Sequence, residues 1–158
     1  MPADAAHTSL WLSFDVLFAA ALVIGMGLEF AMPLSFMPPL RPIVLRIGAT
    51  AAIALGLFLI VAARRQLARA GQSAKPSVPT TELVEEGAFA VSRNPVYLGG
   101  VLLLAGLAMA LDAPWLVPAA VALALAANYL LIVPEERYLA VRFKARYEAY
   151  CERVRRWF

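Results

Sequence analysis

Residues 113–134 read APWLVPAAVALALAANYLLIVP and contain no charged side chain. A run of this length meets the roughly 17–25 residues that a helix needs to cross the ~30 Å hydrocarbon core of a bilayer. Because lipid offers no partners for backbone N–H and C=O groups, such runs of Leu, Ala and Val form helices. The stretch therefore predicts a transmembrane helix.

Three further stretches lack charged residues, and they lie at 16–28, 47–63 and 94–111. With modest extensions the four stretches predict membrane spans at about 10–32, 43–63, 94–111 and 114–133. The first has no basic residue before it and is too long for a signal peptide, so we expect a true span. The chain is 62% hydrophobic with a mean hydropathy of +0.73, far from the composition of a water-soluble domain. We expect an all-α integral membrane four-helix bundle, with 1–158 as a single domain.

The basic residues lie almost entirely on one side of these predicted spans. Four spans place both termini and the central loop together, and of the 14 Lys and Arg residues only Arg41 and Arg46 fall on the other side. By the positive-inside rule, the termini and the central loop are cytoplasmic. The basic pI near 9.4 then follows from topology, and no nucleic-acid partner is needed to explain it.

The cysteine and histidine content excludes several kinds of site. Cys151 is the only cysteine and His7 the only histidine. Disulfide frameworks, Cys/His metal clusters and histidine-based catalytic triads are therefore excluded, and we expect no metal.

The connections between spans are short or irregular. Asp112, Ala113 and Pro114 leave only a tight turn between the third and fourth spans, which predicts an antiparallel helical hairpin. The central loop, 64–92, begins as a helical extension of the second span and then becomes irregular.

Beyond Pro134 the pattern becomes that of a charged amphipathic helix, predicted over 134–156. Its apolar stripe has members three or four residues apart: Glu136, Leu139, Phe143, Tyr147, Tyr150 and Val154. We expect one continuous helix that lies along the cytoplasmic face of the membrane or folds back on the spans.

A first candidate cluster, SRNPVYLGG at 92–100, lies at the predicted cytoplasmic mouth of the third span. Asn94 as N-cap and Pro95 at the first helical position would explain two of these residues as a helix start. Arg93, Tyr97 and the glycines are not explained in this way. The glycines permit close approach of another backbone or of a ligand, and a helix N-terminus beside an arginine suits a carboxylate.

A second candidate cluster, PEER at 134–137, lies at the same end of the fourth span. Acidic residues after a proline are typical of a helix start, because they complement the helix dipole. Alternatively, Glu135 and Glu136 bind a cationic or hydroxylated group. Helical geometry places Glu136 near the centre of the apolar stripe and Glu135 about a quarter turn away, so Glu136 should point into the bundle. The two clusters together would suit S-adenosylmethionine, which carries a carboxylate, an ammonium, a sulfonium and ribose hydroxyls.

Three pieces of sequence resemble the isoprenylcysteine carboxyl methyltransferase and phospholipid methyltransferase family of membrane enzymes. They are TTELV at 80–84 leading to Gly87 and Phe89, SRNPVYLG at 92–99, and PEERYL at 134–139 with the ending RVRRWF. The resemblance implies methyl transfer from S-adenosylmethionine, held at the cytoplasmic face, to a lipophilic acceptor that enters from the bilayer. Motif by motif, it implies a cofactor site at the following residues: Gly87, Phe89, Arg93, Asn94, Pro95, Tyr97, Gly99, Glu135 and Glu136.

Within that predicted site, Arg93 and Glu136 are our candidate catalytic residues. A carboxylate or thiol acceptor needs no general base, whereas an amine does, and His7 is distant in sequence. This favours a carboxylate or thiol acceptor, of the isoprenylcysteine type that the resemblance implies, over a phospholipid amine. A different class of function, a non-catalytic membrane scaffold, and a lipid or steroid reductase of similar architecture stay open as alternatives. The preference for Arg over Lys and the abundant Ala suggest a bacterial inner membrane.

Overall fold

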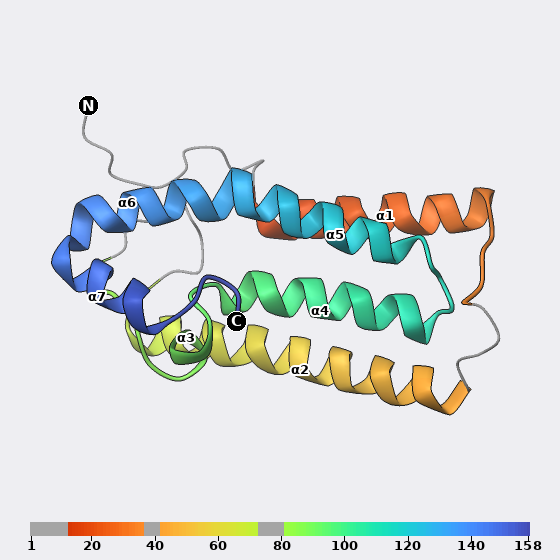
Figure 1. Ribbon diagram of the computed structural model, residues 1–158, viewed down its shortest axis with the longest axis horizontal. Helices are drawn as coiled ribbons and strands as arrows, with labels where there is room; N and C mark the ends of the chain where they lie inside the picture. The colour runs from red at the N-terminus through yellow and green to blue at the C-terminus, as the bar shows by residue number, and fades with distance from the viewer. Residues whose placement is uncertain (1–12, 37–41, 73–80) are drawn as a thin grey trace.

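The computed structural model describes residues 13–36, 42–72 and 81–158, and within these ranges the chain forms helices and irregular connections without a strand (Figure 1). The helices follow one another as α1 (Phe14–Ala31), α2 (Pro42–Arg69), α3 (Ala88–Val91), α4 (Pro95–Ala110), α5 (Leu116–Ala127), the π-helical turn η1 (Asn128–Ile132), α6 (Val133–Phe143) and α7 (Ala145–Arg153). The all-α prediction is confirmed for this part of the chain.

Three of the described helical segments are long and apolar enough to cross a membrane. They are α1, α2 and the continuous run Leu116–Phe143, which joins α5, η1 and α6. The apolar helix α4 has 16 residues and is shorter than the others. The chain is therefore an integral membrane protein, and α4 as a fourth span stays a prediction. The start of the first predicted span, before Ser13, lies outside the described residues.

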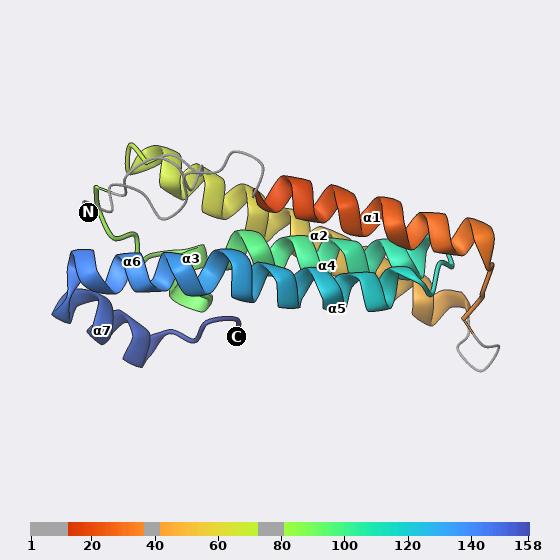
Figure 2. The same cartoon turned by 90° about the horizontal axis from the view of Figure 1, so that it is seen from above.

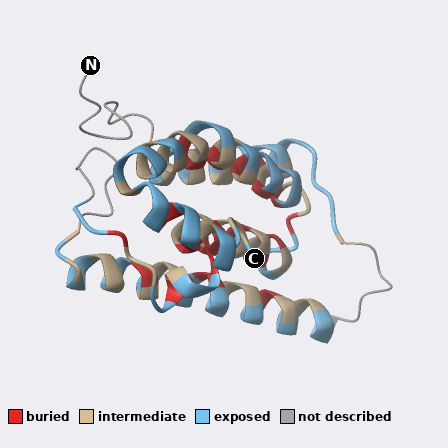
Figure 3. Ribbon diagram, turned by 60° about the vertical axis from the view of Figure 1, so that its left-hand side comes forward, coloured by how far each residue is buried: buried red, intermediate tan, exposed pale blue. Residues whose placement is uncertain are grey.

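The helices pack in an order that places α4 at the centre. It runs along α2 on one side and contacts α5 on the other, while α5 also contacts α1 (Figures 1 and 2). Buried residues line the faces that these helices turn toward one another, and exposed residues cover the outer faces (Figure 3). The outer faces are themselves apolar, with Phe30 93% and Val23 69% exposed. This arrangement suits lipid contact.

At the end of the molecule where α4 ends and α5 begins, acidic side chains accept hydrogen bonds from backbone N–H groups. Asp112, in the tight turn between α4 and α5, accepts from the Phe36 N–H at 2.9 Å. Glu29, near the end of α1, accepts from the N–H groups of Leu34 at 2.6 Å and Trp115 at 3.4 Å. Glu29 thus joins α1 to the start of α5. The predicted hairpin is present, since α5 packs antiparallel against α4 (Figure 1).

The sequence predicted a single helix over 134–156, and the structure differs in two ways. First, the helix does not begin at Pro134. It continues from α5 through η1, where the Val133 N–H bonds to the Asn128 carbonyl. Proline cannot donate a backbone hydrogen bond, and its ring crowds the carbonyl four residues earlier. The π turn directly before Pro134 is wider than an α-helical turn and so accommodates the proline within a continuous helix.

Second, the amphipathic region bends at Lys144, whose φ is 48°. The helix α7 then folds back beside α6 (Figure 2). The half of the predicted stripe after Lys144 is buried against the loop before α3: Leu83, Tyr147, Tyr150 and Val154 form a core, and the partly buried Leu139 and Phe143 pack against it. A straight helix could not bring both halves of the stripe onto this loop.

Candidate functional site

The loop 92–94 and the start of α4 form one side of the candidate site. Ser92 is fully buried, and its hydroxyl accepts from the Asn94 N–H at 3.1 Å. Asn94 occupies the predicted N-cap position and Pro95 follows it, but the Asn94 side chain does not cap the helix. Its Nδ2 instead donates to the carbonyl of Arg156 at 3.1 Å. The Asn94 side chain therefore binds the segment after α7 and not the N-terminus of α4.

Glu136 on α6 is held by two arginines from different parts of the chain. Arg156 donates to it through Nη2 at 2.6 Å and Nε at 3.0 Å, and Arg93 Nη2 lies 3.4 Å from its Oε1. The Glu136 and Arg93 side chains are each 15% exposed. A carboxylate this far from water needs such partners. The structure thus brings together the two residues that the sequence singled out as catalytic candidates.

Arg93 makes further contacts that define its position. Its backbone N–H donates to the Arg155 carbonyl at 3.0 Å, and its guanidinium contacts the thiol of Cys151. Its Nε is buried and has no hydrogen-bond partner among the described residues. Buried N–H donors are almost always satisfied, so an unpaired one marks a place for an acceptor.

Glu135, which precedes Glu136 on α6, has a different partner. It accepts a hydrogen bond from the Tyr97 hydroxyl at 3.2 Å. The Tyr97 ring in turn packs edge-on against Phe14 of α1, with 4.9 Å between the ring centroids. The prediction that Glu136 alone faces the protein is too narrow, because both acids contact α4 or the loop before it.

Gly99 is predicted to line the cofactor pocket, and the structure accounts for it by helix packing. A Cβ at Gly99 would lie 2.6 Å from the Gly56 carbonyl oxygen and 2.8 Å from the Ile60 side chain, both on α2. A glycine at this position permits close approach of either a ligand or another backbone, and in the structure the backbone of α2 occupies this space. A larger side chain at Gly99 would therefore disturb the packing of α4 on α2.

Gly87 and Phe89 belong to the turn that contains α3. Gly87 precedes α3 with a φ of 58°, a conformation that favours glycine. The next residue, Ala88, donates its N–H to Gln66 of α2 at 3.1 Å. The Phe89 carbonyl accepts from the Tyr150 hydroxyl at 2.7 Å. These hydrogen bonds join the α3 turn to α2 and to α7.

Burial and hydrogen bonding alter the ionisation of groups around Arg93. Burial, reinforced by the Glu136 carboxylate, raises the pKa of the Tyr147 hydroxyl above its usual range. Hydrogen bonding to Glu136 raises the pKa of the Arg156 guanidinium, against the opposing effect of desolvation. Tyr147 therefore stays neutral and Arg156 stays charged at physiological pH.

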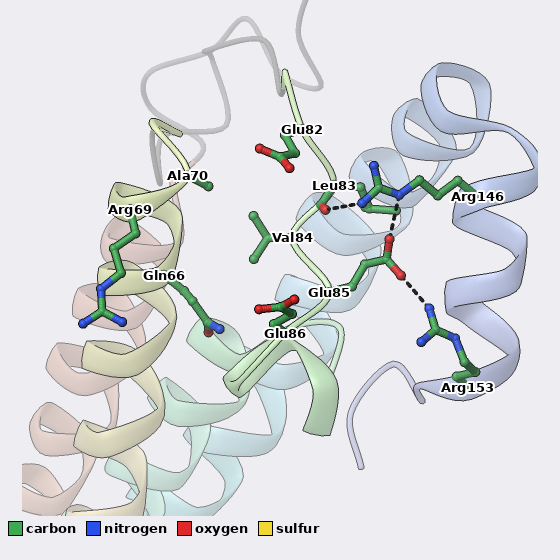
Figure 4. Close-up of a pocket in the computed structure, with 10 residues that line it drawn as sticks. All are labelled: Gln66, Arg69, Ala70, Glu82, Leu83, Val84, Glu85, Glu86, Arg146 and Arg153. Carbon is green, nitrogen blue, oxygen red and sulfur yellow. Dashed lines mark hydrogen bonds and ion pairs between the residues drawn. The ribbon is translucent and has the colours of Figure 1, made fainter.

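A separate cavity of about 560 Å³ opens between the end of α2, the loop 82–86 and α7 (Figure 4). Glu85 spans its α7 side, accepting from Arg146 at 2.8 Å and Arg153 at 2.5 Å. None of the residues predicted to bind the cofactor lines this cavity. The cavity and the Glu136 cluster are thus two distinct features of the same end of the molecule.

Several polar residues of this region were not predicted. Arg156 and Cys151 contact the candidate site, and Asn128 accepts from Arg156 at 3.3 Å. The ending RVRRWF gave an indication of this role, because two arginines lie between the apolar residues Val154 and Trp157 at the end of the apolar stripe. Among the described residues, no group of three His, Cys, Asp or Glu side chains could hold a metal ion.

The helices and the charged cluster at one end of them define a class: a helical membrane protein with a polar site at one mouth. The chain belongs to the phospholipid methyltransferase family, whose model matches residues 44–146. The match contains Arg93, Tyr97 and both acids and ends before the segment 154–158. It confirms the resemblance drawn from the motifs, and membership implies methyltransferase activity in a membrane. The comparisons with curated proteins and with solved structures gave no match.

Proposed function

We propose that the protein transfers a methyl group from S-adenosylmethionine to a lipophilic acceptor. The observation that carries the proposal is the contact of Arg93 with Glu136, because it joins the two motifs at one place, 3.4 Å apart. The family is normally dependent on S-adenosylmethionine, which supports this cofactor. The site combines anion-binding donors with carboxylates, as a molecule with a carboxylate and two cationic groups requires.

The residues present fit this cofactor in chemical type. The buried Arg93 Nε is a donor without a partner in the described chain, and it would take a carboxylate oxygen. Glu136 and Glu135 would accept from the ammonium or from ribose hydroxyls. The cofactor supplies an already activated methyl group, so the task of these side chains is to orient the reactants and exclude water. Pro95, Asn94 and the α3 turn with Gly87 and Phe89 would shape the rim.

The acceptor we propose first is a carboxylate or thiol on a membrane-associated molecule. Such a group is nucleophilic once ionised and requires no proton transfer from the enzyme. The outward faces of α1 and α2 are apolar, which supports entry from the bilayer. The excess of basic residues at this end supports a cytoplasmic site in a bacterial inner membrane.

A phospholipid amine is a second candidate acceptor, and one observation favours it. Glu135 lies 3.2 Å from the Tyr97 hydroxyl, so a carboxylate that could accept a proton from an amine is held near the site. Incubation of the purified protein with tritiated cofactor and either a prenylated cysteine, which carries a free carboxylate, or aminophospholipid vesicles would separate the two. Label in the aminophospholipid alone would select the amine.

Titration calorimetry with S-adenosylmethionine in detergent tests the proposed cofactor. We expect saturable binding to the wild-type protein, weakened by about 1.5 kcal/mol or more in Glu136→Gln, the lower range for a hydrogen bond to a charged group. Glu152→Gln is the matched control, because Glu152 is exposed on α7. Absence of binding to the wild type would favour a non-catalytic scaffold, and binding of a nicotinamide cofactor would favour a reductase.

A further inference from the structure

The segment 154–158, which follows α7, runs back across the loop before α4. The Arg155 carbonyl accepts from the Arg93 N–H at 3.0 Å. The Arg156 carbonyl accepts from Ser92 Oγ at 3.2 Å and Asn94 Nδ2 at 3.1 Å. Ser92 is fully buried and Asn94 is 8% exposed, so these hydrogen bonds are shielded from water. The backbone of residue 156 is thereby fixed beside the candidate site.

The side chain of the same residue reaches two further elements. Its guanidinium donates two hydrogen bonds to the Glu136 carboxylate of α6, at 2.6 and 3.0 Å, and a third to Asn128 Oδ1 of η1 at 3.3 Å. A forked arginine–carboxylate pair fixes both the distance and the orientation of the carboxylate. Residue 156 therefore connects the loop 92–94, η1 and α6.

We propose that Arg156 is a positioning residue that sets the orientation of the Glu136 carboxylate for ligand binding. The inference deepens the proposed function and rests on it. Two of the three donor contacts that the structure gives Glu136 come from Arg156, and the third, from Arg93, is the longest at 3.4 Å. Without the two hydrogen bonds from Arg156, the orientation of the Glu136 carboxylate would be set by Arg93 alone. Arg156 lies outside the range that the family model matches.

A double-mutant cycle on S-adenosylmethionine affinity tests whether Arg156 acts through Glu136. We expect Arg156→Gln to weaken binding roughly tenfold, the effect of losing a hydrogen bond to a charged group. Arg156→Lys should recover only part of this, because an ammonium cannot form the fork. In the Glu136→Gln background, Arg156→Gln should add less than about a twofold loss, since residues that act as one unit are not additive.

The control is Arg155→Gln, because the Arg155 side chain is exposed and the variant keeps the backbone carbonyl that Arg93 contacts. It should bind the cofactor as the wild type does. Full additivity in the cycle would assign Arg156 a merely structural role and overturn the inference. Tighter binding by Arg156→Gln would also overturn it, since Arg156 would then be a competitor for Glu136.

The same cycle measured on thermal unfolding in detergent separates this inference from the proposed function. Coupling between Arg156 and Glu136 in unfolding requires no cofactor. If the wild-type protein bound no S-adenosylmethionine, the proposed function would fall. The unfolding cycle would then still decide whether Arg156 holds Glu136, and absence of coupling there would refute the contact itself.

Discussion

Gly56 of α2 and Gly99 of α4 face each other so closely that a Cβ on either would lie 2.6 Å from the carbonyl oxygen of the other. Gly106, farther along α4, meets α2 in the same way, with its Cβ position 2.9 Å from the Ile53 nitrogen. Small residues that let two helix backbones approach are typical of helix packing in membranes. The glycine of the first motif therefore positions α4 on α2.

The first prediction follows from this contact. Gly99→Ala should lower the free energy of unfolding by about 1–3 kcal/mol, the usual cost of overpacking. The control is Gly27→Ala on α1, where nothing lies within 4 Å of the added Cβ and the helix should gain up to about 1 kcal/mol. Thermal unfolding of both variants in detergent provides the measurement. Equal stability of the two would show that α2 and α4 are not in this close contact.

The second prediction compares the two acids of α6. Glu136→Gln leaves the guanidinium of Arg93, at 15% exposure, without its carboxylate, whereas Glu135→Gln keeps an acceptor for the Tyr97 hydroxyl. We expect the first change to destabilise the protein by about 2 kcal/mol or more and the second by less than about 1 kcal/mol. Unfolding in a denaturant series would measure both. A larger loss in Glu135→Gln would contradict this order.

The third prediction concerns Glu85, which links α7 to the loop 82–86 through Arg146 and Arg153. The Glu85 side chain is 16% exposed, while the two arginines are 56% and 64% exposed. Glu85→Gln should therefore cost about 1 kcal/mol and loosen α7, as expected for a partly buried pair in a small network. Faster amide hydrogen exchange in α7 would be the readout. Glu86→Gln, at an exposed neighbouring position, should leave exchange unchanged.

The fourth prediction concerns orientation in the membrane. In a Cys151→Ser background, a cysteine at Thr81 should resist an impermeant maleimide in intact cells, because the positive-inside rule predicts a cytoplasmic location for the basic end. A cysteine at Leu34, exposed at the opposite end, should react readily. The reverse labelling pattern would invert the topology.

Much of the fold could be predicted from the sequence because lipid imposes simple requirements. Uncharged runs at 47–63 and 113–134 had to be helices, and a three-residue turn at Asp112 had to give a hairpin. The proximity of Arg93 and Glu136 followed from the same topology, since both lie at one end of antiparallel helices. Three helices meet the length of a span, and the shorter α4 leaves the fourth as a prediction.

The rest could not be predicted because it depends on long-range contacts and local backbone geometry. The reversal at Lys144 requires a positive φ in a residue that rarely adopts one, and no spacing pattern indicates it. The role of Arg156 depends on a segment that returns to the loop 92–94, far away in sequence. Gly99 was ambiguous, because a glycine that admits a ligand and one that admits a helix look the same in a sequence.

The π-helical turn at Asn128–Ile132 divides one long helix into a part that contacts lipid and a part that carries Glu135 and Glu136. In an unbroken α-helix, the face that meets the hydrocarbon before the turn would dictate which residues face the protein after it. The extra residue of the π turn resets that rotation. The exposed face of α5, which contains Val121 and Leu125, therefore does not by itself fix the direction of Glu135 and Glu136 on α6. One long helix thus turns one face to the bilayer along α5 and an independently set face to the charged cluster along α6.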